Sequence, residues 1–208
     1  ATILYEIERH YQKIRSNYPG ANLIFAGDHA ATQKSYTSLA YAFVIALLVI
    51  YLTLAAQFQS YLQPIIILSA ISFALIGVIL GKFLTQSLFT VNSFIAIIGV
   101  AGVVVNDSLM LVDFINKAYR SGLSRRQAIN EGIRVRLRPI ILTTVTTTLG
   151  LLPMAIGFPD YSIVWGAMAS TFVTGLVSAT LLTLIIIPVL WDMVQARQER
   201  VQREGTAA

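Results

Sequence analysis

Two adjacent polar residues that could handle protons or cations, Asn106 and Asp107, lie inside the apolar segment VNSFIAIIGVAGVVVNDSLMLVDFIN. A carboxylate at membrane depth costs about 2.5 to 3.5 kcal/mol on insertion scales, and such residues usually face a bundle interior and mark an ion pathway. Asp107 is therefore a candidate for a proton or cation relay. A structural hydrogen bond to a neighbouring helix explains it equally well. Asp113, near the end of the segment, is interpreted as a carboxylate that reaches water.

Small residues accompany these polar groups. Gly99 and Gly102 share a helical face with Asn106, and glycines allow another helix to approach closely. An earlier apolar segment contains a second pair, Gly77 and Gly81, at GxxxG spacing. All four glycines are predicted to be helix-packing positions.

A dense run of threonines follows the basic turn in RVRLRPIILTTVTTTLGLLPM. A threonine hydroxyl in a helix can bond its own i−3 or i−4 carbonyl, so the run by itself indicates little. Thr143 and Thr147, however, lie one turn apart on a single face, where they could hold a partner side chain or a water. Thr143 is the candidate that we single out.

Several other kinds of chemistry have no support in the sequence. With no cysteine and only His10 and His29, a thiolate metal site, a disulfide framework and an imidazole cluster are not expected. No phosphate-binding loop, dinucleotide fingerprint, metallopeptidase motif or nucleophile elbow is present, so we predict no enzyme and no cofactor. The formal net charge is +5, but the basic residues lie beside apolar runs without interleaved aromatics, so no nucleic-acid partner is expected.

Five apolar segments must position these residues, and each is close to the ~20 residues that span ~30 Å of hydrocarbon. With 56% hydrophobic and 12% charged residues, a soluble domain is excluded and an all-α integral membrane fold is predicted. A short α/β remnant, with a helix over residues 3–15 and a strand over 22–26, precedes the spans. The predicted parts are an extramembrane piece (1–35), transmembrane helices (36–56, 64–84, 91–115, 139–157, 162–190), a basic loop or helix (116–138) and a tail (191–208).

The distribution of Lys and Arg predicts the orientation. Basic residues concentrate in segments 116–138 and 191–208, which are therefore assigned to the cytoplasm, and five spans then place the N-terminal piece outside. The stretch SRRQAINEGIRVR within the basic segment is predicted to form a short helix along the inner membrane surface, near anionic lipid.

Three stretches together resemble the resistance-nodulation-division (RND) superfamily, specifically the C-terminal membrane half of its hydrophobe/amphiphile multidrug efflux pumps of Gram-negative inner membranes. They are LAAQFQSYLQPIIIL, GVAGVVVNDSLMLVDFIN and RVRLRPIILTTVTTTLGLLPM. The resemblance implies a multi-pass inner-membrane permease that exports small amphiphilic compounds in exchange for protons. It also implies a homotrimer with a periplasmic adaptor and an outer-membrane channel, and makes residues 1–35 the end of a periplasmic porter domain.

The resemblance also carries site residues. Matched motif to motif, the relay lysine of such pumps falls on Asn106, which Asp107 follows, while the relay threonine falls on Thr143 and the arginine on Arg136. The lysine is absent, and a relay without it lacks the ammonium group that pairs with ionised aspartates. This departure puts the coupling ion in question, though not the fold.

Two alternatives to drug export remain open. One is a related exporter of metal ions, lipids or other cargo, although Met110, Met154 and Met168 do not form a single stripe. The other is a non-transporting membrane scaffold or sensor, which accounts for the packing motifs. A scaffold does not explain why Asn106 and Asp107 are tolerated in hydrocarbon.

Overall fold

The structure is a computed structural model that describes residues 9–11, 13, 28–87, 89–160 and 162–206. It divides into two units, residues 1–38 and 39–208. In the first unit, residues 9–11 and 13 are helical. The predicted strand over 22–26, and most of the predicted helix over 3–15, lie outside the described residues.

Five long helices account for nearly all of the rest of the described chain, and each contains a stretch long and apolar enough to cross a membrane. This confirms the predicted all-α architecture with five candidate spans. The helices are α2 (Asp28–Phe58), α3 (Leu62–Thr85), α4 (Val91–Arg120), α5 (Arg125–Ile156) and α6 (Ile163–Thr206).

Local sequence sets where these helices begin and end. Thr90 and Ser93 form a capping box at the start of α4, in which the Ser93 N–H donates to Thr90 Oγ1 over 3.3 Å. At the start of α5, the Ser124 N–H donates to Gln127 Oε1 over 3.1 Å. Helix α5 ends where Gly157 adopts a φ of +81°, a conformation that glycine reaches without steric cost.

Helix α5 differs from the two separate elements that the sequence suggested. A surface helix before Pro139 and a span starting at that residue were expected, but one helix runs through it from Arg125 to Ile156. Proline removes a single backbone donor and need not end a helix when packing holds both sides. Before Pro139 that packing comes from the buried Ala128 and from Gly132, where a Cβ atom would overlap Ile115 of α4, and after it from the buried Ile140 and Thr144.

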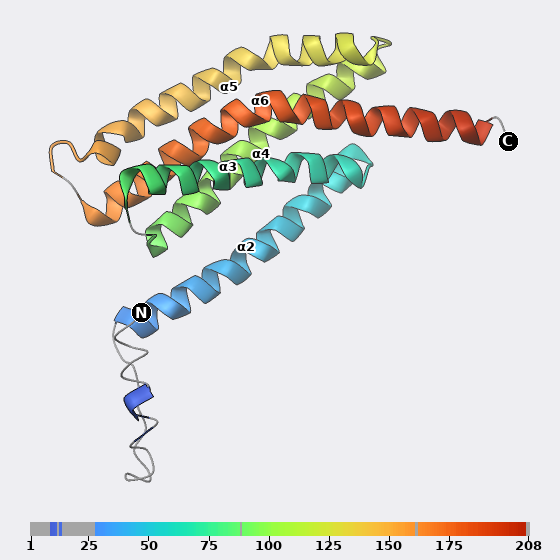
Figure 1. Ribbon diagram of the computed structural model, residues 1–208. Coiled ribbons are helices and arrows are strands. Elements are labelled where there is room, and N and C mark those ends of the chain that lie inside the picture. Colours follow the sequence, from blue (N-terminus) through green and yellow to red (C-terminus); the bar gives the residue numbers. More distant parts are fainter. Residues whose placement is uncertain (1–8, 12, 14–27, 88, 161, 207–208) are drawn as a thin grey trace. The chain divides into compact units, whose positions relative to one another are not determined.

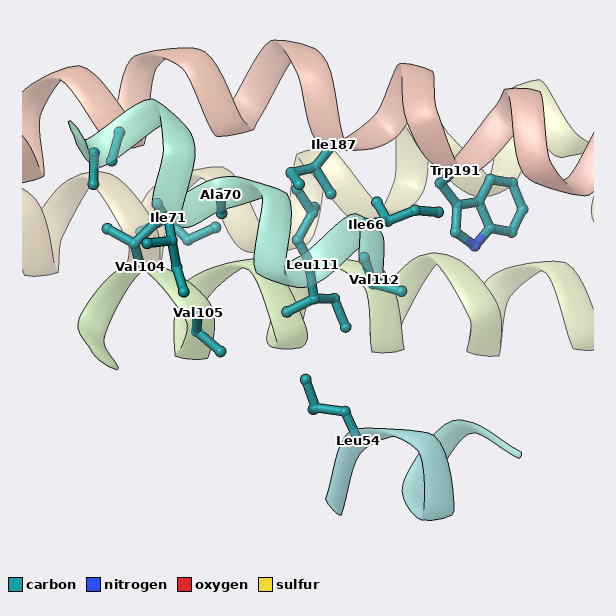
Figure 2. Packing of buried hydrophobic residues seen from close by; sticks show 14 of the residues in the cluster. Leu54, Ile66, Ala70, Ile71, Val104, Val105, Leu111, Val112, Ile187 and Trp191 are labelled. Carbon is teal, nitrogen blue, oxygen red and sulfur yellow. The ribbon is translucent and has the colours of Figure 1, made fainter. Parts of the chain in front are cut away.

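Helix α6 is the centre of the second unit, because it packs against α3, α4 and α5 (Figure 1). Figure 2 shows the buried cluster that these helices share, with Val112 of α4 and Ile187 and Trp191 of α6 among its members. Leu54 and Phe58, in the last two turns of α2, belong to the same cluster. Earlier in α2, large apolar side chains such as that of Leu48 are exposed, which suits a helix surrounded by lipid or by further helices.

Glycines bring α3 close to α6. A Cβ atom on Gly77 would lie 2.6 Å from the carbonyl oxygen of Thr174 and would overlap Ser178. A Cβ atom on Gly81 would overlap the Thr174 side chain. The structure therefore places both residues of the GxxxG pair at this helix crossing, where a larger side chain has no room.

Candidate relay site on α4 and α5

Asn106 and Asp107 lie in the second half of α4 but in different surroundings. Asn106 is exposed and Asp107 is half-buried. Within the described part of the chain, neither side chain has a hydrogen bond or an ion pair. Their polar groups are thus left for a partner that the described residues do not provide.

The face of α4 that carries Asn106 is open along several turns. Ile95, Gly99, Gly102, Asn106 and Met110 follow one another at helical spacing, and all five are exposed. A Cβ atom on Gly102 would meet no described atom within 4 Å, whereas one on Gly99 would lie 3.0 Å from Cε2 of Phe172. This face can therefore admit another helix or a ligand beside Asn106.

Asp113 forms an ion pair within α4. Its Oδ2 lies 2.6 Å from Lys117 Nζ, one helical turn away, and 29% of its side chain is exposed. An exposed i, i+4 pair of this kind contributes little to stability, about 0.3 to 0.5 kcal/mol. The two aspartates of α4 thus contrast, since Asp113 is paired and Asp107 is not.

Thr143 is exposed on α5, and its hydroxyl donates to its own helix, to the Ile140 carbonyl over 2.9 Å. The neighbouring Thr144 makes the contact between helices. It is buried, and its Oγ1 lies 2.8 Å from Oγ1 of Thr180 on α6. A hydrogen bond between membrane helices typically contributes about 0.6 kcal/mol.

Arg136 lies at the boundary between α4 and α5. Its guanidinium carbon is 3.9 Å from the centroid of the Phe114 ring, which places the cation over the aromatic face. Its Nε is buried and has no hydrogen-bond partner among the described residues. Arg136 therefore holds a positive charge against α4 while one of its donors remains unused.

The four relay candidates thus occupy two neighbouring helices, with Asn106 and Asp107 on α4 and Arg136 and Thr143 on α5. No hydrogen bond or ion pair in the described chain joins any two of them. The four side chains supply hydrogen-bond donors and one carboxyl group, but they are not connected to one another by hydrogen bonds. A proton relay through them therefore requires a further polar group between them.

A buried polar cluster, which the sequence did not single out, joins three helices near the end of the bundle where α5 begins. Asn116 of α4 donates through Nδ2 to Gln63 Oε1 of α3 over 2.8 Å, and Trp191 Nε1 of α6 donates to Asn116 Oδ1, also over 2.8 Å. Asn116 and Trp191 are 8% and 1% exposed, so these bonds satisfy groups that water does not reach. We call Gln63, Asn116 and Trp191 the amide cluster.

Comparison with known proteins identifies the family. A family model described as the AcrB/AcrD/AcrF family matches residues 2–195. The swarming motility protein SwrC of Bacillus subtilis is 33% identical over 181 residues, which cover 86% of this chain and 17% of that protein. The multidrug resistance protein MdtC of Erwinia tasmaniensis is 34% identical over 80% of this chain and 16% of that protein.

Metal-related proteins also match. The nickel-cobalt-cadmium resistance protein NccA of Alcaligenes xylosoxydans is 29% identical over 90% of this chain and 17% of that protein. A crystal structure of a heavy metal efflux pump superposes with a TM-score of 0.73 at 26% identity, covering 88% of this chain and 19% of the other. The chain spans less than a fifth of these relatives. The match over almost all of its own length nevertheless shows that it belongs to the AcrB/AcrD/AcrF family of RND efflux transporters.

Proposed function

We propose that this chain is the relay-bearing part of a secondary transporter that exports drugs or other amphiphilic compounds in exchange for protons, and that it catalyses no reaction. The carrying observation is that Asn106, on the open face of α4, and the half-buried Asp107 beside it have no partner among the described residues. A carboxyl group at this depth is retained at a cost in free energy, which a role in ion movement explains. The family supports the assignment to efflux, and MdtC carries the multidrug name.

In this proposal Asp107 takes up and releases the proton. Asn106 stands where the family resemblance expects a lysine, so its amide would hydrogen-bond a carboxyl group on another segment without adding a charge. Arg136, with its unused Nε, would supply the positive charge that the lysine supplies elsewhere. The Thr143 hydroxyl would turn from its own backbone toward a water or a carboxyl group on the path.

The setting of the transporter is part of the same proposal. The end of α4, the first turns of α5 and the end of α6 would face the cytoplasm, because Lys and Arg concentrate there. The whole protein would be a homotrimer in the inner membrane, coupled to a periplasmic adaptor and an outer-membrane channel, as the family resemblance implies.

A second candidate function is the export of metal ions. It rests on the likeness to NccA and to the heavy metal efflux pump. The same relay could drive export of amphiphiles or of metal ions. Only a transport measurement with each cargo therefore distinguishes the two functions.

The test is transport by the full-length protein in reconstituted vesicles with an imposed pH gradient. Export of a fluorescent amphiphile that follows the gradient, with at least about tenfold loss in Asp107→Asn and marked loss in Asn106→Ala, is the expected result. Asp113→Asn is the matched control, because that carboxylate is already paired with Lys117 and should leave the rate unchanged. Full activity in Asp107→Asn would overturn the relay. Gradient-driven movement of Ni²⁺ or Co²⁺ in place of the amphiphile would establish the second candidate.

A further inference from the structure

A cavity of about 430 Å³ opens between the first turns of α5 and the last third of α6. Its walls are of two kinds. Charge comes from Arg125, Arg126 and Asp192, and an apolar surface comes from Ile129, Pro188, Val189 and Met193. None of the relay candidates lines it, and it lies where α6 changes from the apolar run LLTLIIIPVL to the charged run WDMVQARQER, a change of composition typical of the boundary between hydrocarbon and lipid headgroups.

The charges around this cavity are only partly matched. Arg125 is shared, with Nη1 lying 3.4 Å from Asp192 and Nε lying 3.5 Å from Glu199. Glu199 also accepts a hydrogen bond of 2.6 Å from the Tyr119 hydroxyl, so it is well satisfied. Asp192 has one long contact and a side chain that is 48% exposed, which leaves its carboxylate with unused acceptor capacity.

Arg126 is the opposite case. It is exposed, and within the described part of the chain it has no ion pair or hydrogen bond. The cavity therefore offers one unused guanidinium and one underused carboxylate, with no large excess of either sign. A ligand that suits it carries an anionic group and a cationic hydrogen-bond donor a short distance apart.

The apolar wall indicates what else the ligand must contain. Val189 and Met193 are 53% and 63% exposed on the outer side of α6, so they form a surface against which hydrocarbon can lie. One water occupies about 30 Å³ of liquid, so the cavity has room for roughly a dozen groups of that size. A phosphate, a short amine and the first carbons of two acyl chains fit within that space.

We propose that this cavity binds the headgroup of a phosphatidylethanolamine. Arg126 would hold the phosphate through charge-assisted hydrogen bonds, Asp192 would accept from the primary ammonium, and the acyl chains would lie over Val189 and Met193. A choline headgroup has no N–H to donate to Asp192. A glycerol headgroup can donate hydroxyl hydrogen bonds to Asp192, but it is uncharged and so brings no positive charge to offset the carboxylate. The chemistry of the site therefore selects the ethanolamine headgroup.

The experiment measures which lipid the purified full-length protein retains, by native mass spectrometry after incubation with equimolar ethanolamine, choline and glycerol phospholipids with identical acyl chains. The wild-type protein should retain the ethanolamine lipid preferentially. Arg126→Gln should lower its retention about tenfold, the factor that corresponds to loss of one charge-assisted hydrogen bond. Arg120→Gln is the control, because it removes the same charge from an exposed arginine outside the cavity.

Asp192→Asn is the sharper variant. It removes the negative charge that attracts the ammonium and leaves Arg125 with Glu199 as its one acidic partner, so the preference should invert toward the anionic glycerol lipid. This inversion cannot come from unfolding, which would lower the retention of all three lipids together. The proposal is overturned if the wild type binds the three lipids equally or prefers the anionic one. It is also overturned if Arg126→Gln and Arg120→Gln behave alike.

Discussion

Polar residues of the same type have different hydrogen-bond and ion-pair partners in this protein. Asp107 and Asp113 are on the same helix, yet Asp113 is paired with Lys117 and Asp107 has no partner in the described chain. Thr143 and Thr144 are adjacent, yet one hydroxyl is satisfied within α5 while the other reaches α6. Each pair allows a role in transport to be tested against a structural role with one matched substitution.

Thr144→Val should lower the stability of the helix bundle by about 0.6 kcal/mol and at most about 1.7 kcal/mol, because it removes a hydrogen bond between two membrane helices. The cost stays modest because Thr180 keeps its own bond to the Leu176 carbonyl, at 2.9 Å. Thr143→Val should change stability by less than about 0.5 kcal/mol. The measurement is the denaturation midpoint of the purified protein in micelles.

In the vesicle assay we expect the opposite order, with the larger effect on transport coming from Thr143→Val. If Thr143 belongs to the relay, Thr143→Val lowers gradient-driven export while Thr144→Val leaves it near the wild-type rate. Loss of transport in Thr144→Val alone would move the functional role to the buried threonine.

The sequence alone could rank these residues only partly. It indicates that Thr143 and Thr147 share a face, but which face of α5 meets α6 depends on how the two helices rotate against each other. The rotation of α5 is set by its packing against both neighbours, including the close approach of Gly132 to Ile115 of α4. The contact between Thr144 and Thr180 joins residues 36 positions apart, and no periodicity reveals it.

At the scale of elements, the sequence predicts the number of membrane helices better than the residues at which each helix begins and ends. Hydropathy and length indicate five spans, and five are found. The single helix α5 was not expected, because Pro139 is also typical of a first helical turn. With 32 residues, α5 is about 48 Å long, so its basic first turns extend past the ~30 Å of hydrocarbon.

The crossing of α3 and α6 is the element-level contact most sensitive to side-chain size. Gly77→Val should destabilise the bundle by about 1 to 3 kcal/mol, because the added carbons overlap Ser178 and the Thr174 backbone. Gly150→Val is the control, since a Cβ atom there meets no described atom within 4 Å. Equal denaturation midpoints for the two variants would contradict this packing.

At the scale of the whole molecule, α6 joins α3, α4 and α5 into one bundle, while the α4 face with Asn106 stays open among the described residues. The relatives are about six times longer than their matched segment. The sequence identifies no partner for Asn106, because hydropathy and spacing within one helix do not show what meets its open face. The absent lysine is visible only through the family resemblance.

The proposed orientation can be tested by labelling the whole protein, with any cysteine outside this chain first replaced by serine, since this chain itself contains no cysteine. A thiol introduced as Ser121→Cys, between α4 and α5, should react with a membrane-impermeant reagent only from the cytoplasmic side. One introduced as Asp160→Cys, between α5 and α6, should react only from the other side. Both residues are exposed, and the reverse labelling pattern would invert the proposed topology.

The amide cluster has a spectroscopic consequence. The chain has two tryptophans, of which Trp165 is 57% exposed and Trp191 is 1% exposed. With Trp165 replaced by phenylalanine, the emission from this chain comes from one indole that is hydrogen-bonded to Asn116 and packed edge-on against Tyr119 at 5.6 Å. The wavelength and lifetime of that emission would then register, within nanoseconds and without an added dye, whether α3, α4 and α6 stay joined as the transporter works.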